Sequence, residues 1–229
     1  MGILSSSTSV VRYKVNGKIK EPLLDTIAHG LIKHRISEID NNSEDKTSGW
    51  TSFKSPYLTD FSGSSFIYDP YVVFSLRIDK KSIPPKTIQK QYVTEISRRL
   101  ANNDRTYISR HEKKEIKDQI IASLGMRIPA TPNIYDVIWF PEKSTLWFFS
   151  TLKSANEEVE SLFLKSFSLS IIRLFPYTQA FYMEGFSDRE KDKLNNLSPS
   201  NFAASRINDR LSDNDFGPAG GGTRESPSE

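Results

Sequence analysis

Seven stretches of the chain have the hydrophobic pattern of β-strands, with apolar residues at every second position or in short continuous runs. Residues 9–15 show the clearest alternation, and residues 71–78 form the most hydrophobic stretch. Residues 39–48 are polar and predict a loop, and Pro141-Glu142-Lys143 predicts the turn of a hairpin. The predicted strands cover residues 9–15, 49–54, 64–68, 71–78, 134–140, 144–152 and 169–175.

Two helices are predicted beside these strands, each with apolar residues at helical spacing. The first follows Pro22, because proline is tolerated where a helix begins. The second follows Ser154-Ala155-Asn156-Glu157, a capping-box pattern in which serine and glutamate satisfy each other's backbone donors. The apolar positions are Leu23, Leu24, Ile27, Leu31 and Ile32 in the first, and Val159, Leu162, Phe163 and Phe167 in the second.

Two more helices are predicted between residues 84 and 125, joined by a turn at residues 101–107. The first opens at Pro84-Pro85, and the second opens with a capping box at residues 109–112 and ends near Gly125. Each has only a narrow apolar stripe, so the pair should form a hairpin with a thin apolar seam and polar outer faces. The stripe residues are Ile88, Tyr92, Ile96 and Leu100, then Ile116, Ile120 and Leu124.

These elements predict an α+β fold: an antiparallel or mixed sheet with packed helices, into which a two-helix hairpin is inserted. We expect residues 1–76 and 134–176 to form the sheet domain and residues 77–133 to form the hairpin, or tip. Residues 187–229 are polar and end in a stretch rich in Gly, Ser and Pro, so we expect this tail to be disordered.

Charge is concentrated in the same hairpin. The whole chain of 229 residues has a net charge of only +3. Residues 77–127, however, contain thirteen basic and six acidic residues, a net of +7, whereas the remainder carries −4. The basic residues are Arg77, Lys80, Lys81, Lys86, Lys90, Arg98, Arg99, Arg105, Arg110, Lys113, Lys114, Lys117 and Arg127.

This basic segment has two interpretations. A solvated helical surface is the ordinary one, but such surfaces usually mix both signs in i,i+4 pairs and sum to nearly zero. An excess of one sign is typical of a surface that binds nucleic acid, where each neutralised phosphate releases condensed counterions. We therefore expect the basic residues after Arg77 to contact the phosphate backbone of a nucleic acid.

Other chemistry finds little support in the sequence. There is no cysteine, which excludes thiol catalysis and cysteine-ligated metals, and no run of apolar residues long enough to span a bilayer. His29 and His34 are five residues apart rather than at ligand spacing, and His111 lies inside a capping box. Phosphate-binding and nucleotide-binding glycine motifs are missing. We expect no catalytic residue, no metal site and no cofactor.

The acidic and aromatic residues have structural interpretations as well. Asp69, Asp79 and Glu95 could serve a metal-dependent nuclease only if folding brought them together, and nothing in their spacing predicts this. Strand positions favour the sheet core over a base-stacking platform for four aromatics, while Trp50 fits either core or interface. The four are Trp139, Trp147, Phe148 and Phe149.

The sequence around the hairpin resembles the bacterial recombination-associated RdgC family. The resemblance rests on residues 77–88 (Arg-Ile-Asp-Lys-Lys-Ser-Ile-Pro-Pro-Lys-Thr-Ile), residues 111–118 (His-Glu-Lys-Lys-Glu-Ile-Lys-Asp), Leu124 and the strand bearing Trp139. Gly49-Trp50 and residues 146–167 follow in matching order, so that it covers approximately residues 8–176.

The resemblance implies a non-sequence-specific binder of single- and double-stranded DNA that forms a dimeric ring around the duplex and limits access of the RecA recombinase. It also implies that the helical insertion is the tip of each subunit and contacts DNA. Two departures are visible. The family continues past the position of Tyr177 with a further folded block, and its aromatic finger after the second tip helix is replaced here by Ile128 or Pro129. Ile128 would keep an apolar wedge without base stacking.

The combined reading is a cytoplasmic, nucleoid-associated, dimeric DNA-binding protein that is not an enzyme. Two alternatives remain at this point: a protein-interaction module whose basic hairpin docks on an acidic partner, and a metal-dependent nuclease. The residues expected at the DNA are Lys80, Lys81, Lys86, Lys90, Arg98, Arg99, Arg105, Arg110, Lys113, Lys114, Lys117, Arg127 and Ile128.

Overall fold

The chain forms two compact units, Met1–Gln179 and Ala180–Glu229, and the first contains both the sheet and the helical hairpin. The computed structural model describes residues 2–40, 42, 44–61, 63, 65–102, 107–182 and 185–198. The α+β class is confirmed, and each predicted strand and helix is present. One strand covers Lys46–Thr51 rather than residues 49–54 and so begins inside the predicted loop 39–48, and the helices Pro176–Phe181 and Asp188–Asn195 were not predicted.

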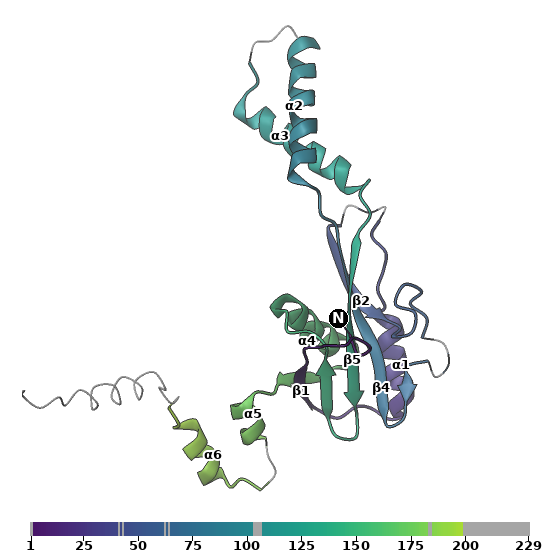
Figure 1. The fold of residues 1–229 in the computed structure, drawn as a ribbon, viewed down its shortest axis with the longest axis vertical. Coiled ribbons are helices and arrows are strands. Elements are labelled where there is room, and N and C mark those ends of the chain that lie inside the picture. Colours follow the sequence, from purple (N-terminus) through teal and green to yellow (C-terminus); the bar gives the residue numbers. More distant parts are fainter. Residues whose placement is uncertain are drawn as a thin grey trace, which may run out of the picture. The chain divides into compact units, whose positions relative to one another are not determined.

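All named strands belong to one antiparallel sheet in the order β2-β4-β5-β6-β1-β7, with β3 paired to the first two residues of β4 (Figure 1). The hairpin connects β4 to its direct neighbour β5 and therefore does not interrupt the sheet. The strands are β1 (Val11–Asn16), β2 (Lys46–Thr51), β3 (Ile67–Tyr68), β4 (Tyr71–Lys80), β5 (Thr131–Phe140), β6 (Thr145–Phe148) and β7 (Ser170–Arg173).

The helices begin near the predicted signals. Pro22 precedes α1, Pro85 is the first residue of α2, and Ser109 caps α3. The helices are α1 (Leu23–Lys33), α2 (Pro85–Asn102), α3 (Arg110–Gly125), α4 (Lys153–Phe167), α5 (Pro176–Phe181) and α6 (Asp188–Asn195).

The main core lies between one face of the sheet and the helices α1 and α4. Alternate residues of β4, among them Phe74 and Leu76, point into it, as do Trp139 of β5 and Phe148 of β6. Trp50 is completely buried here, so its ambiguous sequence position belongs to the core rather than to an interface. Its ring contacts Phe74 and its indole N–H donates to Ser166 Oγ of α4 at 2.7 Å.

The predicted capping box at residues 154–157 does not form. The N-cap of helix α4 is Leu152, two residues before Ser154, and the helix begins at Lys153, so that Ser154 already lies in the first turn. Asn156 holds this helix start instead. Its side chain donates to the carbonyl oxygens of Leu152 and Ser150 and accepts a hydrogen bond from the buried hydroxyl of Tyr13.

The prediction that Trp147 belongs to the core is also wrong. Its neighbours Leu146 and Phe148 are completely buried, whereas Trp147 is 37% exposed. Successive side chains of a strand point to opposite faces, and only the face that carries Leu146 and Phe148 is covered by α1 and α4. Trp139 and Phe149 are buried as expected.

The second unit contains a helix where composition predicted no fixed structure. Helix α6 spans Asp188–Asn195, and Glu190 accepts a hydrogen bond from the backbone N–H of Ser187 at 2.8 Å. The hydrogen bonds from Ser187 lower the pKa of Glu190. None of its residues is buried, so local capping rather than a core stabilises it. The remainder of the predicted tail, residues 199–229, lies outside the described residues.

Gly30 sets the distance between α1 and α4, and we expect Gly30→Ala to destabilise the protein. A Cβ at this position would lie 2.5 Å from Cε1 of Phe167 and 2.9 Å from the carbonyl oxygen of Ser166. Overpacking of this kind costs about 1–3 kcal/mol of unfolding free energy, measurable by urea denaturation. Gly125→Ala is the matched control, because nothing lies within 4 Å of its added Cβ, and an equal loss in both variants would contradict the close-approach argument.

Candidate nucleic-acid interface

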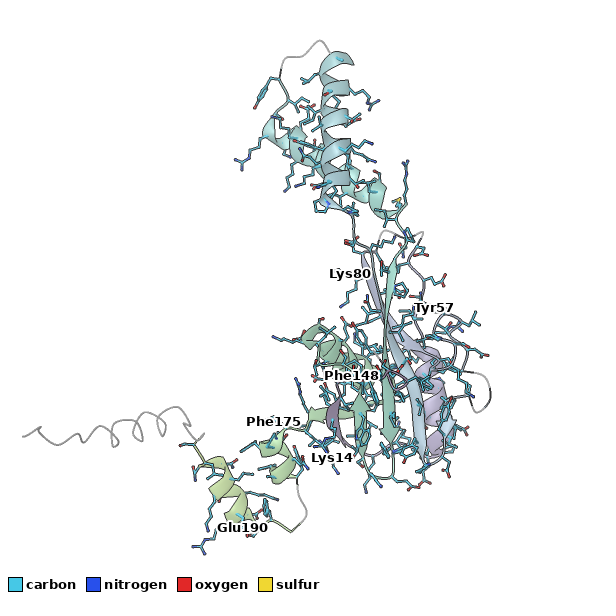
Figure 2. All side chains as sticks on the ribbon, in the orientation of Figure 1. Lys14, Tyr57, Lys80, Phe148, Phe175 and Glu190 are labelled. Carbon is cyan, nitrogen blue, oxygen red and sulfur yellow. The ribbon has the colours of Figure 1, made fainter. Side chains whose placement is uncertain are left out.

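The hairpin stands on the longest pair of strands in the sheet. β4 and β5 are paired from Val72 opposite Trp139 to Lys80 opposite Thr131. Residues 77–80 and 131–133, which the sequence placed in the tip, are therefore part of the ladder. Helices α2 and α3 lie beyond the ends of these two strands (Figure 1). Lys80 is the last residue of β4, where the chain leaves the sheet toward the hairpin (Figure 2).

The hairpin has a small core of its own. The α3 stripe of Ile116, Ile120 and Leu124 is buried together with Ile108, which confirms the predicted seam. The α2 stripe packs on it and is partly buried. The N-terminal end of α3 is capped as predicted, with Ser109 Oγ accepting from the backbone N–H of Glu112 at 3.2 Å.

Lys81 is buried and cannot reach a phosphate, which corrects its assignment to the DNA contacts. It is 6% exposed, and its ammonium group donates to the carbonyl oxygens of Asn42 at 2.6 Å, Gly125 at 2.8 Å and Asp40 at 3.3 Å. These are all three of its donors. Since Gly125 ends α3, Lys81 ties the beginning of the hairpin to its end.

Arg77 is neutralised in a similar way by its own strand. Its guanidinium forms a bidentate pair with Asp79 at 2.7 and 2.6 Å, and both side chains are buried. The group also lies over the ring of Tyr57. The positive excess counted from residue 77 onward therefore overstates the charge available to a ligand.

Most other basic residues of the hairpin are exposed to solvent. Lys86, Lys90, Lys114 and Lys117 form no ion pair with any described residue. The exposed cations are Lys80, Lys86, Lys90, Arg98, Arg110, Lys113, Lys114, Lys117 and Arg127.

One carboxylate organises two of the arginines on α2. Arg98 donates to both oxygens of Glu95, at 2.9 and 2.8 Å, and Arg99 donates to the same carboxylate at 2.9 Å. The hydrogen bonds from Arg98, and next those from Arg99, lower the pKa of Glu95 to about 2. Arg99 also contacts Gln119 of α3 and is only half-exposed, so it belongs more to the helix contact than to the outer surface.

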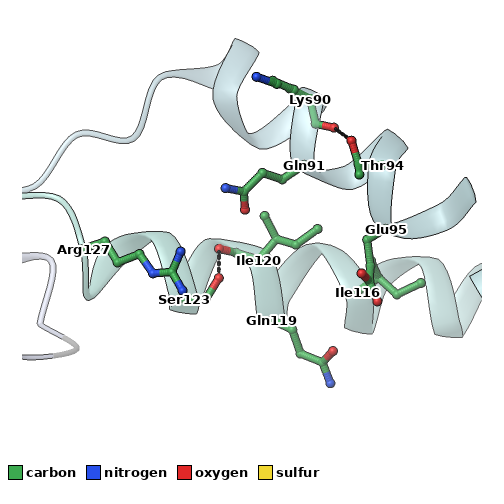
Figure 3. A pocket seen from close by; sticks show the side chains of 9 residues that line it. All are labelled: Lys90, Gln91, Thr94, Glu95, Ile116, Gln119, Ile120, Ser123 and Arg127. Carbon is green, nitrogen blue, oxygen red and sulfur yellow. Dashed lines mark hydrogen bonds between the residues drawn. The ribbon is translucent and has the colours of Figure 1, made fainter. Parts of the chain in front are cut away.

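A groove of about 540 Å³ runs between α2 and α3 (Figure 3). Ile116 and Ile120 form its apolar part, and amides, hydroxyls and two cations surround them. Figure 3 shows Gln91 of α2 above Ile120 of α3, with Arg127 at one end of the groove and Lys90 on α2. The groove is thus an open surface of mixed character, with an apolar floor and two cations and one carboxylate, Glu95, among its lining residues.

Three further positions complete the tip. Arg105 lies outside the described residues. Ile128, the predicted wedge, is half-buried, and its backbone N–H donates to Leu124. Tyr107 was not predicted as a site residue, although it is 70% exposed and lies 5.8 Å from the ammonium group of Lys113. An aromatic residue next to a cluster of cations is the signal that could have identified it.

The acidic residues considered for metal binding do not meet. Asp79 is paired with Arg77, Glu95 lies on α2 with its arginines, and Asp69 lines a different pocket beside Leu23. Within the described residues, no group of three or more His, Cys, Asp or Glu could hold a metal ion. His111 lies 3.6 Å from Glu115 on the surface of α3.

No helix in the described part of the chain is both long and apolar enough to cross a membrane.

Comparison with known proteins gives one family. Residues 9–181, more than half of the chain, match the family model described as "Putative exonuclease, RdgC". The match includes the sheet, the hairpin and α5. A search of the curated proteins finds no match.

We expect Lys81→Met to destabilise the hairpin, because the substitution leaves three carbonyl oxygens without their donor. A hydrogen bond that involves a charged group typically stabilises a protein by about 1.5–3 kcal/mol. The cost of burying the ammonium group offsets part of this gain, so the unfolding free energy should fall by at least about 1 kcal/mol. Lys80→Met changes the exposed neighbour and should stay within about 0.5 kcal/mol. Urea unfolding and amide exchange in α3 measure both, and equal values would refute the anchoring role of Lys81.

Proposed function

The chain belongs to the RdgC family, and we propose that it binds DNA by the phosphate backbone without reading base sequence. Membership of this recombination-associated family supports a general role related to DNA recombination. The observation that supports backbone binding most directly is the set of exposed, unpaired lysines on α2 and α3.

Long lysine side chains suit phosphate binding without base selectivity. Phosphate contacts position a protein on DNA, whereas hydrogen bonds to base edges supply specificity. Lys86 and Lys90 are one turn apart on α2, and Lys113 and Lys117 are one turn apart on α3, so each pair projects from one side of its helix. A hairpin with its own core can present these cations with little change of shape.

The proposal extends to assembly and role. Two copies would enclose the duplex as a dimeric clamp in the nucleoid, bind single strands as well, and limit the access of RecA to DNA. This part is supported by family membership rather than by a contact in the structure.

We further propose that the protein is not an enzyme, although the family description contains the word exonuclease. The hairpin groove is lined by two cations, amides, hydroxyls and one carboxylate, Glu95, which is already engaged by Arg98 and Arg99. The described His, Asp and Glu residues do not gather into a group of three that could hold a metal ion for cleavage. The interaction-module alternative differs in its ligand, an acidic protein surface in place of DNA.

We expect the protein to bind DNA with a steep salt dependence, and we expect this binding to need the lysines of the hairpin. Engagement of about five or six phosphates gives a slope of log K against log salt near −5. Changing Lys86, Lys90, Lys113 and Lys117 to glutamine should weaken binding equally across sequences and flatten the slope by up to about four. Fluorescence anisotropy with duplexes of different sequence, over a salt series, measures both effects.

The matched control changes four exposed lysines of the sheet domain to glutamine, namely Lys18, Lys20, Lys33 and Lys165. It alters net charge by the same amount, so it should retain nearly the wild-type slope. Equal binding by the two quadruple variants would mean that the hairpin does not hold the DNA. A slope near zero for the wild type would favour the interaction module.

We expect duplex and single-stranded DNA to keep their length during prolonged incubation with the protein and Mg²⁺ or Mn²⁺. Progressive shortening that requires the metal would identify a nuclease.

The same samples, analysed by size-exclusion light scattering with and without duplex, should give the mass of a dimer. A monomer in both conditions would rule out the clamp while leaving backbone binding intact.

A further inference from the structure

The face of the sheet opposite α1 and α4 carries a row of aromatic side chains. Tyr71, Phe140 and Trp147 come from the neighbouring strands β4, β5 and β6. Tyr71 and Trp147 are each 37% exposed, and Phe140 is half-buried. Three large rings that form one partly open, contiguous group are of the kind that often marks an interaction site.

The three rings are in contact with one another. The ring centroids of Tyr71 and Phe140 are 4.4 Å apart at 90°, and those of Phe140 and Trp147 are 5.4 Å apart at 52°. Because Phe140 supports both neighbours, their ring positions are set by packing before any ligand arrives. Such preorganisation lowers the ordering cost of binding.

Cations continue the same face beyond the rings. Arg12 of β1 lies directly opposite Trp147 in the ladder, and Lys14 lies opposite Thr145 one step further along. Directly opposite residues have their Cβ atoms about 5 Å apart. The exposed Arg12 guanidinium donates to the side-chain oxygen of Gln179 at 2.9 Å, a neutral partner that leaves its positive charge uncompensated. On the other side, the ammonium group of Lys143 lies 6.0 Å from the ring of Phe140.

Two acidic groups of this face, Asp136 and Asp79, are already engaged, whereas Asp69 and Glu142 lie beside Tyr71 at the end of the row away from Arg12. Asp136 accepts hydrogen bonds from Ser75 Oγ at 2.8 Å and from the backbone N–H of Ile3 at 2.9 Å. Asp79 is paired with Arg77. Figure 2 shows Lys14 in the lower part of the sheet, away from the helical hairpin. The face therefore offers aromatic surface and positive charge together.

We propose that this face binds single-stranded nucleic acid, with a base stacked on Trp147 and phosphates held by Arg12, Lys14 and Lys143. Aromatic side chains accept every base, because every base has a π-face, and cations beside them follow the backbone. A duplex offers no free base face to Trp147, so the site distinguishes single strands from the duplex held by the hairpin. The inference rests on the proposed DNA-binding function and adds a second, chemically different site to it.

Tryptophan fluorescence tests the proposal directly, because Trp50 and Trp139 are buried and only Trp147 is open to a stacked base. The probe for quenching is an unlabelled oligothymidylate of about 16 nucleotides. The same oligothymidylate with a fluorescein label serves for anisotropy. The wild type should show quenching. Trp147→Phe should lose the quenching but keep most of the affinity, and Trp147→Ala should bind about fivefold more weakly or worse. Duplex affinity should be unchanged in both variants.

The outcomes separate this site from the hairpin. In the quadruple lysine variant of the hairpin, quenching of Trp147 by the oligothymidylate should persist. Wild-type duplex binding combined with equal oligothymidylate binding by the two Trp147 variants would overturn the sheet site alone. The Trp147→Ala variant could instead change its mass in light scattering and still bind the oligothymidylate. This result would also overturn the sheet site, because the face would then join two copies of the chain. Absence of salt-dependent binding to any DNA would remove the proposed function as well.

Discussion

The antiparallel pairing of β4 with β5 is the interaction on which the rest of the structure depends. The ladder begins inside the main core, at Val72 opposite Trp139, and ends outside it, at Lys80 opposite Thr131. Its backbone hydrogen bonds fix where the chain leaves the sheet and where it returns, and thereby fix the base of the helical hairpin. Lys81 completes this base by bonding the last carbonyl of α3.

Two separate cores follow from this arrangement. The sheet core is closed by α1 and α4, and the hairpin core consists of a few isoleucines and leucines between α2 and α3. A small core leaves the outer helical faces free, and these faces carry the cations. The opposite face of the sheet carries aromatics, among which Trp147 is partly exposed. The same fold thus offers one surface suited to phosphates and another suited to exposed bases.

Counting charges along the sequence overstated the binding surface, and the structure shows why. Arg77 and Lys81 are as basic as their neighbours, but one is paired with Asp79 and the other is saturated by backbone carbonyls. A buried cation must find such partners, since leaving it unpaired would cost several kcal/mol. Burial and pairing, rather than residue type, decide which cations remain available to a ligand.

The sequence by itself determined the α+β class, the positions of the helices at Pro85 and Ser109, and the seam of the hairpin, because strand alternation, helical spacing and capping are local properties. Only the tertiary structure decided that Trp147 faces away from the core, that Leu152 caps α4, and that Lys81 is internal. Alternation divides a strand between two faces but does not say which face helices will cover. Likewise, the partners of Lys81 lie about forty residues away on either side, beyond the reach of any local pattern.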